Sequence, residues 1–456
     1  MKENLKMINQ KIPVLFVFVL FMTVSLSSCI KQSVSTEKTT QNPKTFVFDR
    51  KPKTPIVFLS TQLNPVEEAA KMRNDILKDF PGQVEFRPND SNYVFDQITA
   101  LQKKDPGKTI LIGALHGDLE KLQEQKSLMP VDAIYAALTD RKINQNLISL
   151  SKLDGKSAYY IPWMQASFLM VANKKALKYL PKGASLQSLT YDQLAEWAKN
   201  IQAGTKKPGL GFPAGEKGLM HRFLQGYLYP SYTRSTLLKY RSDDAKTMWI
   251  YFRDLWKYVH PGSLTYSSMD EPLLMDDVLI AWDHTARLIK VFEKRPEDFV
   301  AFPAPIGPKG RGFMTVVSGL AIPNKTSDTE SLEILIDYLT QPAVQIRTLL
   351  ATGFFPVLEV SEGDSLSGNM KELYNAVSNQ TNSTDSIPTL LPIGLGESGA
   401  AYNSIFMLTF SEIVLGGKDI NSVLDESAKE LQSILDKQNL KCWLPDISDE
   451  RPCKIE

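Results

Sequence analysis

Short apolar runs alternate with longer amphipathic stretches where the folded part of the chain begins. Three runs are of the buried-strand type: residues 56–60, 84–86 and 109–113. The two stretches between them carry apolar side chains at helical spacing: residues 66–80 and 93–101. This βαβαβ order predicts a mostly parallel sheet with helices on both faces, whose ligands bind beyond the carboxyl ends of the strands.

More strands and helices are expected after residue 156. Strands are predicted at residues 157–162, 168–172, 278–282, 299–303 and 316–322. Two capping boxes, Thr190-Tyr191-Asp192-Gln193 and Ser327-Asp328-Thr329-Glu330, predict helix starts. Helices dominate towards the C-terminus, but residues 361–382 are polar and rich in Ser and Asn, which predicts a surface stretch.

The N-terminus has the pattern of an export signal. Three lysines precede an apolar run over residues 12–24, which is short for a bilayer span of about 20 residues. Leu26-Ser27-Ser28-Cys29 then resembles the lipobox at which bacteria attach diacylglycerol to a cysteine and cleave before it. We expect a lipoprotein signal peptide over residues 1–28 and a membrane anchor on Cys29. The alternative is an ordinary signal peptide with an incidental cysteine.

Two further features are expected of an exported chain. Residues 29–54 are rich in Ser, Thr, Gln, Lys and Pro, which predicts a flexible tether, so that the folded body begins near Pro55. Once Cys29 is lipidated, only Cys442 and Cys453 remain, and an even number of cysteines in an exported protein predicts a disulfide. Two unpaired thiols are the alternative.

Composition and motifs exclude several classes of function. The chain has 52 Lys and Arg against 51 Asp and Glu, a net charge of +1, so no large basic field attracts nucleic acid. The sequence contains no His-Glu-x-x-His, no phosphate-binding Gly-x-x-x-x-Gly-Lys-Ser/Thr, no Cys-x-x-Cys and no Gly-x-Ser-x-Gly. Its four His show no metal-ligand spacing. We therefore expect no metal, no cofactor and no catalytic residues.

Several segments carry a family resemblance in the same order along the chain. Asp154-Gly155-Lys156, then Ile161-Pro162-Trp163 and Asn173-Lys174-Lys175, form the most diagnostic stretch. Other matching segments are residues 109–118, 279–283, 302–310, 318–323 and 353–356. Together they resemble the family 1 extracellular solute-binding proteins, the maltose- and sugar-binding receptors of ABC transporters.

That resemblance implies an α/β fold of the two-lobed periplasmic-binding-protein type (type II, maltose-binding-protein-like), with discontinuous lobes and a hinged cleft. Residues 55–161 and 285–340 would form lobe 1, and residues 162–284 and 341–456 lobe 2. The chain would be a monomer that faces the periplasm or the cell exterior. It would bind a small molecule in the cleft, deliver it to ABC-transporter permease subunits, and catalyse nothing.

A sugar site needs aromatic faces together with carboxylates, amides or Arg at its edge. On the resemblance, the ligand contacts are Thr61, Gln62, His116, Asp118, Trp163, Gln165, Ser167, His221, Tyr227, Trp282, Asp283 and Tyr402. The alternative for the aromatic residues is core packing. Asp118 could instead cap the helix that follows it, and Asp283 could pair with Arg287 one helical turn on.

Two other functions are compatible with the sequence. A lipid-anchored glycoside hydrolase would need two carboxyl groups about 5 to 10 Å apart across a cleft. The same type of receptor could also take a polyamine, a metal or a peptide as its ligand. Aromatic and amide side chains in the expected contact loops favour a sugar or a related polyol.

Overall fold

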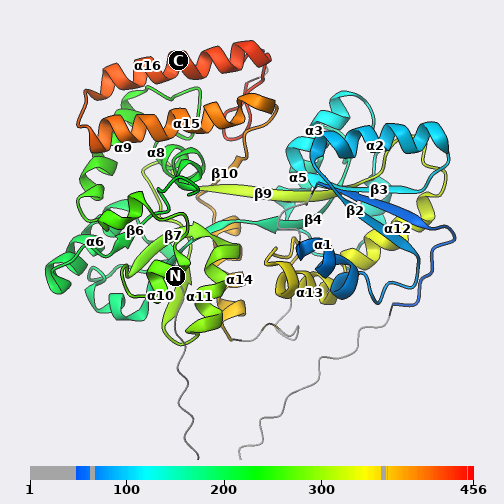
Figure 1. Cartoon of the computed structure of the whole chain (residues 1–456), viewed down its shortest axis with the longest axis horizontal. Helices are drawn as coiled ribbons and strands as arrows, with labels where there is room; N and C mark the ends of the chain where they lie inside the picture. The colour runs from blue at the N-terminus through cyan, green and yellow to red at the C-terminus, as the bar shows by residue number, and fades with distance from the viewer. Residues whose placement is uncertain (1–47, 62–66, 361–365, 367, 449) are drawn as a thin grey trace, which may run out of the picture. The chain divides into compact units, whose positions relative to one another are not determined.

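The alternating segments at the start of the body form parallel strands and helices, as the sequence predicts. The computed structural model describes residues 48–61, 67–360, 366, 368–448 and 450–456, which belong to one compact unit. β1 (Ile56–Ser60) pairs in parallel with β2 (Val84–Pro88) and with β3 (Ile110–Leu115). All residues of β1 are buried because helices cover both faces of the sheet (Figure 1). The predicted βαβαβ order is confirmed.

Three more strands complete this first sheet. β9 (Arg311–Ala321) runs antiparallel to β3, and β10 (Ser386–Leu390) runs parallel to β9. β4 (Ile161–Ala166) also pairs antiparallel with β9. The order across the first sheet is therefore β10-β9-β3-β1-β2, with β4 on β9.

A second sheet has the order β6-β7-β5-β8. Its strands are β6 (Leu210–Gly211), β7 (Ile280–His284), β5 (Phe168–Asn173) and β8 (Phe299–Phe302). β8 lies in the stretch that was expected in lobe 1, yet it pairs with β5. Residues 299–302 thus belong to the second sheet, while the division into lobes itself stays a prediction.

Helices cover both sheets (Figure 1). Those that contribute to the apolar clusters around the first sheet are α1 (Glu67–Lys71), α2 (Ser91–Lys104), α3 (His116–Glu124), α4 (Asp132–Ala137), α5 (Gln145–Ser151), α12 (Thr329–Leu339) and α13 (Pro342–Thr352). Those around the second sheet are α6 (Tyr191–Thr205), α7 (Met220–Phe223), α8 (Tyr229–Thr233), α9 (Asp243–Trp256), α10 (Asp270–Leu274), α11 (Thr285–Lys294), α14 (Gly368–Asn382), α15 (Gly399–Phe410) and α16 (Ile420–Gln438).

Helix caps follow the sequence signals closely. The capping box at Thr190 is present in full, because the hydroxyl accepts from the Gln193 amide and the Gln193 side chain accepts in return. At α12 the cap is Asp328, one residue later than the start of the predicted box, and it accepts from the Ser331 amide. α13 ends at Gly353, whose φ of 78° suits a residue without a Cβ.

The last residues of the predicted tether contact the body. Phe48 packs edge-on against Tyr338 of α12, with ring centroids 5.4 Å apart. Arg50 pairs with Asp337, and the Thr54 hydroxyl donates to Asp328. Residues 48–54 are therefore held on α12, while the remainder of the predicted tether, the signal segment and Cys29 lie outside the described residues.

The polar stretch before residue 382 was expected at the surface, but much of it forms α14. Leu373, Ala376 and Val377 of this helix are buried, and so is Gln380. Gln380 is tolerated inside because its amide is fully engaged: Oε1 accepts from the Ala304 amide, and Nε2 donates to Ser167 Oγ and Phe168 O. The surface interpretation is wrong for α14.

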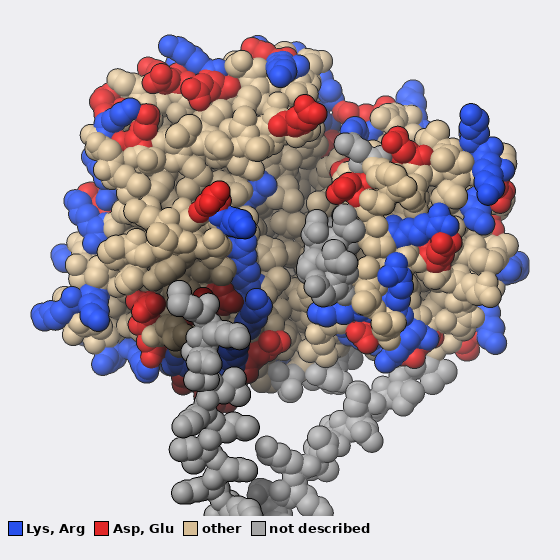
Figure 2. Space-filling model, in the orientation of Figure 1, with Lys and Arg blue, Asp and Glu red and all other residues tan. Residues whose placement is uncertain are grey.

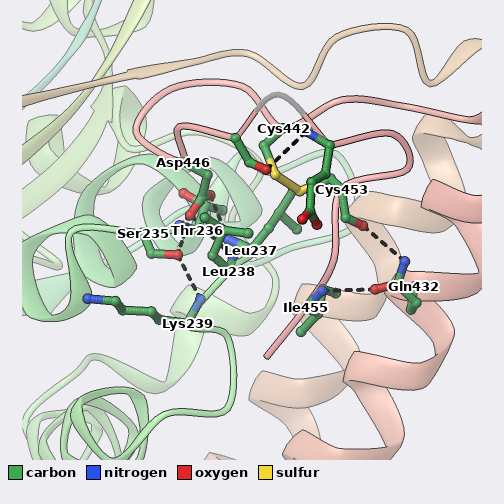
Figure 3. The surroundings of a disulfide bond; sticks show 12 residues. Ser235, Thr236, Leu237, Leu238, Lys239, Gln432, Cys442, Asp446, Cys453 and Ile455 are labelled. Atoms are coloured by element: carbon green, nitrogen blue, oxygen red, sulfur yellow. Dashed lines mark hydrogen bonds between the residues drawn. A yellow bond between two sulfur atoms is a disulfide. The ribbon is translucent and has the colours of Figure 1, made fainter.

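A disulfide closes a loop in the C-terminal tail, and a buried carboxylate within that loop binds the body (Figure 3). The predicted disulfide is present between Cys442 and Cys453. Within the loop that it closes, buried Asp446 accepts from the Ser235 hydroxyl and from the amides of Thr236 and Leu237. The Asp446 carboxylate thereby caps the turn between α8 and α9 and holds the tail on the body. No helix among the described residues is long and apolar enough to span a bilayer.

Removing the disulfide should destabilise the chain measurably. In the chain-entropy model, a loop closed by cysteines 11 positions apart contributes about 3 kcal/mol. We expect the double variant Cys442→Ser/Cys453→Ser to melt a few degrees lower in scanning calorimetry. Wild-type protein held in a strong reductant serves as the control and should melt near the variant. Equal melting temperatures for all three samples would contradict a stabilising role.

Candidate functional site

The chain first crosses between the two sheets at Ser167. β4 ends at Ala166 in the first sheet and β5 begins at Phe168 in the second. The Ser167 carbonyl accepts from the Thr285 amide at 2.9 Å, and its Oγ accepts from Gln380 Nε2 at 2.9 Å. Ser167 is a predicted ligand contact, but its carbonyl and its Oγ accept hydrogen bonds that hold the crossing together.

Gln165 lies just before the crossing and is similarly occupied. Its Nε2 donates to Pro356 O at 2.7 Å, and its backbone exchanges two hydrogen bonds with Phe355. The side chain borders a cavity of about 450 Å³, whose other walls come from residues 142–146, 356–359 and α14. The Nε2 group of Gln165 is thus occupied by the chain itself.

The four aromatic residues predicted to contact ligand are core residues in this structure. Trp163, Tyr227, Trp282 and Tyr402 each have 0% of their surface exposed. Trp282 lies flat on Phe168, with ring centroids 4.8 Å apart, and the Tyr227 hydroxyl donates to Phe168 O. Because none of these four rings has an open face, stacking on a sugar would require each to be uncovered first.

His116 and Asp118 line the largest of the described cavities, which measures about 840 Å³. Both are in the first turn of α3, directly after β3. Opposite them the cavity is bounded by Thr315 and Val317 of β9 and by the segment that follows β10. This is the carboxyl edge of the parallel strands, where the sequence placed the ligand.

Burial shifts the pKa of two polar groups that line this cavity. Burial raises the pKa of Asp118, whose Oδ2 accepts from Ser91 Oγ at 3.1 Å. Burial lowers the pKa of His116, whose Nδ1 lies 2.9 Å from the Tyr160 hydroxyl. Asp118 does not occupy the N-cap position of α3, which is Leu115, because it is the third residue of that helix. Thr61 lies close by and accepts from the Leu115 amide, whereas Gln62 is outside the described residues.

Asp283 is enclosed at the end of β7. Its carboxylate accepts from the amides of Met269 and His284, and Arg287 Nη1 lies 3.4 Å away. The expected alternative, a pair with Arg287, is therefore present. Burial raises the pKa of Asp283 to about 6, despite the opposing effect of Arg287. With 0% exposed surface, the carboxylate organises the start of α11 and is not open to a ligand.

His284 caps α11 and should make stability depend on pH. Its Nδ1 accepts from the Ala286 amide at 3.2 Å, and burial together with Arg287 lowers its pKa to about 4. An unfolded histidine titrates near 6.5, so the folded chain holds fewer protons between about pH 4 and 6.5. The contribution of His284 to the free energy of unfolding is thus present above pH 6.5 and is lost as the pH falls. Asp283, with a raised pKa, acts with the opposite sign between about pH 4 and 6.

We expect His284→Asn to flatten this dependence, because asparagine can still cap the helix but does not titrate. Between pH 4.5 and 7, the gain in unfolding free energy should shrink by about 2 kcal/mol relative to wild type. Urea unfolding of the wild type and the variant at pH 4.5 and at pH 7 measures this difference. Parallel curves for the variant and the wild type would show that His284 is not the titrating group.

Sequence reasoning missed Arg222, Gln225 and Asn403, which form a polar cluster beside the predicted His221. Arg222 Nη1 donates to Gln225 Oε1 at 2.9 Å, and Gln225 Nε2 donates to Asn403 Oδ1 at 3.0 Å. Burial, Arg222 and Arg287 lower the pKa of His221 to about 3, so its ring is neutral at physiological pH. Only the polar character of α7 within an aromatic region could have indicated this cluster, since residues 222 and 403 are brought together by the fold alone.

No group of three or more His, Cys, Asp or Glu side chains in the described part of the chain is arranged to hold a metal ion.

The chain belongs to the bacterial extracellular solute-binding protein family, because the model of that family matches residues 67–346, more than half of the sequence. Comparison with curated proteins finds no match. Among solved structures, the sugar-binding protein MalE from Xanthomonas citri has a TM-score of 0.66 at 16% identity, covering 84% of this chain and 98% of that one.

Two further structures are similar over the same extent. Maltose-bound MalE3 from T. maritima has a TM-score of 0.59 at 16% identity, covering 84% of this chain and 100% of that chain. UgpB from Mycobacterium tuberculosis, in complex with glycerophosphocholine, has a TM-score of 0.60 at 18% identity, covering 84% of this chain and 99% of that chain. At such low identities the structural similarity establishes the fold alone, which is the two-lobed α/β fold of maltose-binding-type receptors.

Proposed function

We propose that the chain is the substrate-binding lipoprotein of an ABC importer. It captures a sugar or a related polyol or glycoside in a cleft between its lobes, delivers it to the permease, and does not alter it chemically. The observation that carries the proposal is the cavity of about 840 Å³ lined by His116 and Asp118 of α3 and by Thr315 of β9. A cavity at the carboxyl edge of the sheet with a few convergent polar groups is what a small polar solute needs.

The crossing explains how capture could be signalled. Because β4 and β5 are joined through Ser167, a small backbone rotation there would move the two sheets relative to each other. A solute that contacts both sides stabilises the closed form, and a permease can distinguish closed from open by its surface. The transporter therefore receives loaded receptors in preference to empty ones.

A membrane anchor at Cys29 would keep the receptor near its permease, facing the periplasm or the cell exterior. The support is the lipobox-like Leu26-Ser27-Ser28-Cys29 behind a short apolar run. A Cys29→Ala variant should leave the membrane fraction of the producing cell, while wild type stays in it with the mass of an acylated chain. An unmodified wild-type Cys29 would leave the receptor proposal standing but remove the anchor.

Thermal unfolding of the full-length chain with a panel of sugars, polyols, polyamines and peptides tests the ligand class. A solute at 100 times its dissociation constant adds about 2.7 kcal/mol of stability, enough for a shift of a few degrees. We expect one sugar or polyol class to give this shift. Asp118→Asn should reduce it, whereas Asp254→Asn, an exposed carboxylate on α9, should not.

Other outcomes discriminate between the alternatives. A rise in melting temperature with only a polyamine or a peptide would support the receptor function but contradict a sugar as its ligand. Asp118 and Glu397 both line the cavity of about 840 Å³, so two carboxyl groups are available there. Each oligosaccharide that raises the melting temperature should therefore also be incubated with the protein, and its products examined by chromatography. Cleavage that disappears in Asp118→Asn would replace the receptor by a glycoside hydrolase.

A further inference from the structure

Arg222 has no acidic partner among the described residues. It is partly buried on α7, and the hydrogen bond from its Nη1 goes to the neutral amide of Gln225. By contrast, Arg287 pairs with Asp283 and Arg141 with Asp337. Burial lowers the pKa of Arg222 to about 10, which still leaves the guanidinium charged at physiological pH. A shielded positive charge without a counter-ion is costly unless a ligand supplies one.

The side chains linked to Arg222 are neutral amides. Asn403 Oδ1 is taken by Gln225 Nε2, so the free end of the Asn403 side chain is its NH₂ group. Gln225 is 1% exposed and holds the Asn403 side chain through this hydrogen bond. The Tyr402 hydroxyl is fully buried and has no hydrogen-bond partner among the described residues. Arg222 and the NH₂ group of Asn403 together suit an acceptor-only group.

The cluster links α7 to α15, two helices that pack around the second sheet, through Gln225. α7 packs on α15, and α15 begins just after Gly396 and Glu397, which line the cavity of about 840 Å³. α11 begins at Thr285, whose amide bonds to Ser167 at the crossing. Figure 2 shows a hollow on this face of the molecule, with Lys and Arg side chains together with several Asp and Glu along one of its walls.

We propose that the solute carries an anionic substituent, a carboxylate or a phosphate, and that Arg222 binds it with Asn403 donating alongside. This inference rests on the proposed receptor function and narrows its ligand class to acidic or phosphorylated sugars and polyols. Arg222 offers the planar fork that carboxylate and phosphate oxygens accept bidentately. The same donors disfavour polyamines and metal ions, because they leave such a cation without ligands and repel it.

Titration calorimetry of the full-length chain with matched neutral and anionic solutes tests the inference. The probes are glucose, glucuronate and glucose 6-phosphate, then glycerol and glycerol 3-phosphate, with inorganic phosphate and sulfate alone. We expect at least one anionic member to bind about 10-fold or more tighter than its neutral counterpart, with an affinity that falls as salt is added. Glucuronate against the phosphates shows which anion the site prefers.

Substitutions assign the effect to the site. Arg222→Gln should weaken the anionic ligand by about 10- to 100-fold, and Arg222→Lys by less. Asn403→Asp, which places a negative charge beside Arg222, should also abolish the preference for the anion. Arg253→Gln on α9 is the matched control and should bind as wild type does. Melting curves of each variant confirm that it is folded.

Different results would contradict the anionic site and the receptor function. If neutral sugars bind as tightly as their anionic counterparts and Arg222→Gln changes neither, the anionic site is wrong and the receptor remains. Anion binding that survives both Arg222→Gln and Asn403→Asp also overturns the assignment. If no solute of either kind binds the wild-type chain, the sugar receptor and the anionic site fall together.

Discussion

Trp282→Ala is expected to lower the free energy of unfolding by about 3–5 kcal/mol. The indole is fully buried, lies flat on Phe168, and meets the rings of Phe223 and Tyr227 at centroid distances of 5.1 and 5.2 Å. Truncation therefore removes a large packed surface and leaves a cavity that these rings cannot fill by themselves. Guanidinium chloride unfolding of wild type and variant measures the loss.

The control for Trp282→Ala is Tyr93→Ala, since Tyr93 on α2 is 53% exposed and its removal should change stability by less than about 0.5 kcal/mol. The experiment also separates two interpretations of Trp282. A variant with normal stability and lost solute binding would show that the ring is a ligand-stacking plate, as the sequence suggested, and not part of the core.

Asp337→Ala should also lower the free energy of unfolding by about 3–5 kcal/mol, because it removes the more shielded of the two carboxylates that pair with a buried charge. The Arg141 side chain is 1% exposed, and its Nη2 lies 2.6 Å from Asp337 Oδ1. Asp337 also pairs with Arg50 at 2.8 Å, so its loss would loosen the segment that precedes β1. Urea unfolding measures the change.

Two further variants test the cause of the stability loss in Asp337→Ala. Asp140→Ala removes the other, 72% exposed partner of Arg141 and should cost far less. Arg141→Met combined with Asp337→Leu removes both buried charges and should be less harmful than Asp337→Ala alone. Equal losses for Asp337→Ala and the double substitution would mean that the buried Arg141 charge is not the cause of the loss.

Local signals were sufficient for the strands and helices that have clear periodicity. β1, β2 and β3 and the helix opened by Thr190 form where the sequence predicts them, because apolar spacing and caps are properties of neighbouring residues. α14 was missed because its composition is polar, and its buried Gln380 makes sense only beside Ser167 and Ala304, residues far away in the chain.

The site was harder to predict than the fold. The sequence places His116 and Asp118 in the strand-end loop where the structure has the cavity of about 840 Å³. It could not tell that Trp163 and Trp282 are enclosed, since an aromatic residue in a loop and one in the core have the same local pattern. Nor could it relate Arg222 to Asn403, because their connection through Gln225 exists only once α7 and α15 are packed together.

The fate of a bound solute tests the receptor function most directly. The full-length chain should be titrated in a calorimeter with the solute that stabilises it most, and the solute should then be released and analysed by chromatography. The receptor predicts saturation at one equivalent per chain and recovery of the solute unchanged, even after prolonged incubation. Recovery of a cleaved or otherwise altered product would contradict it.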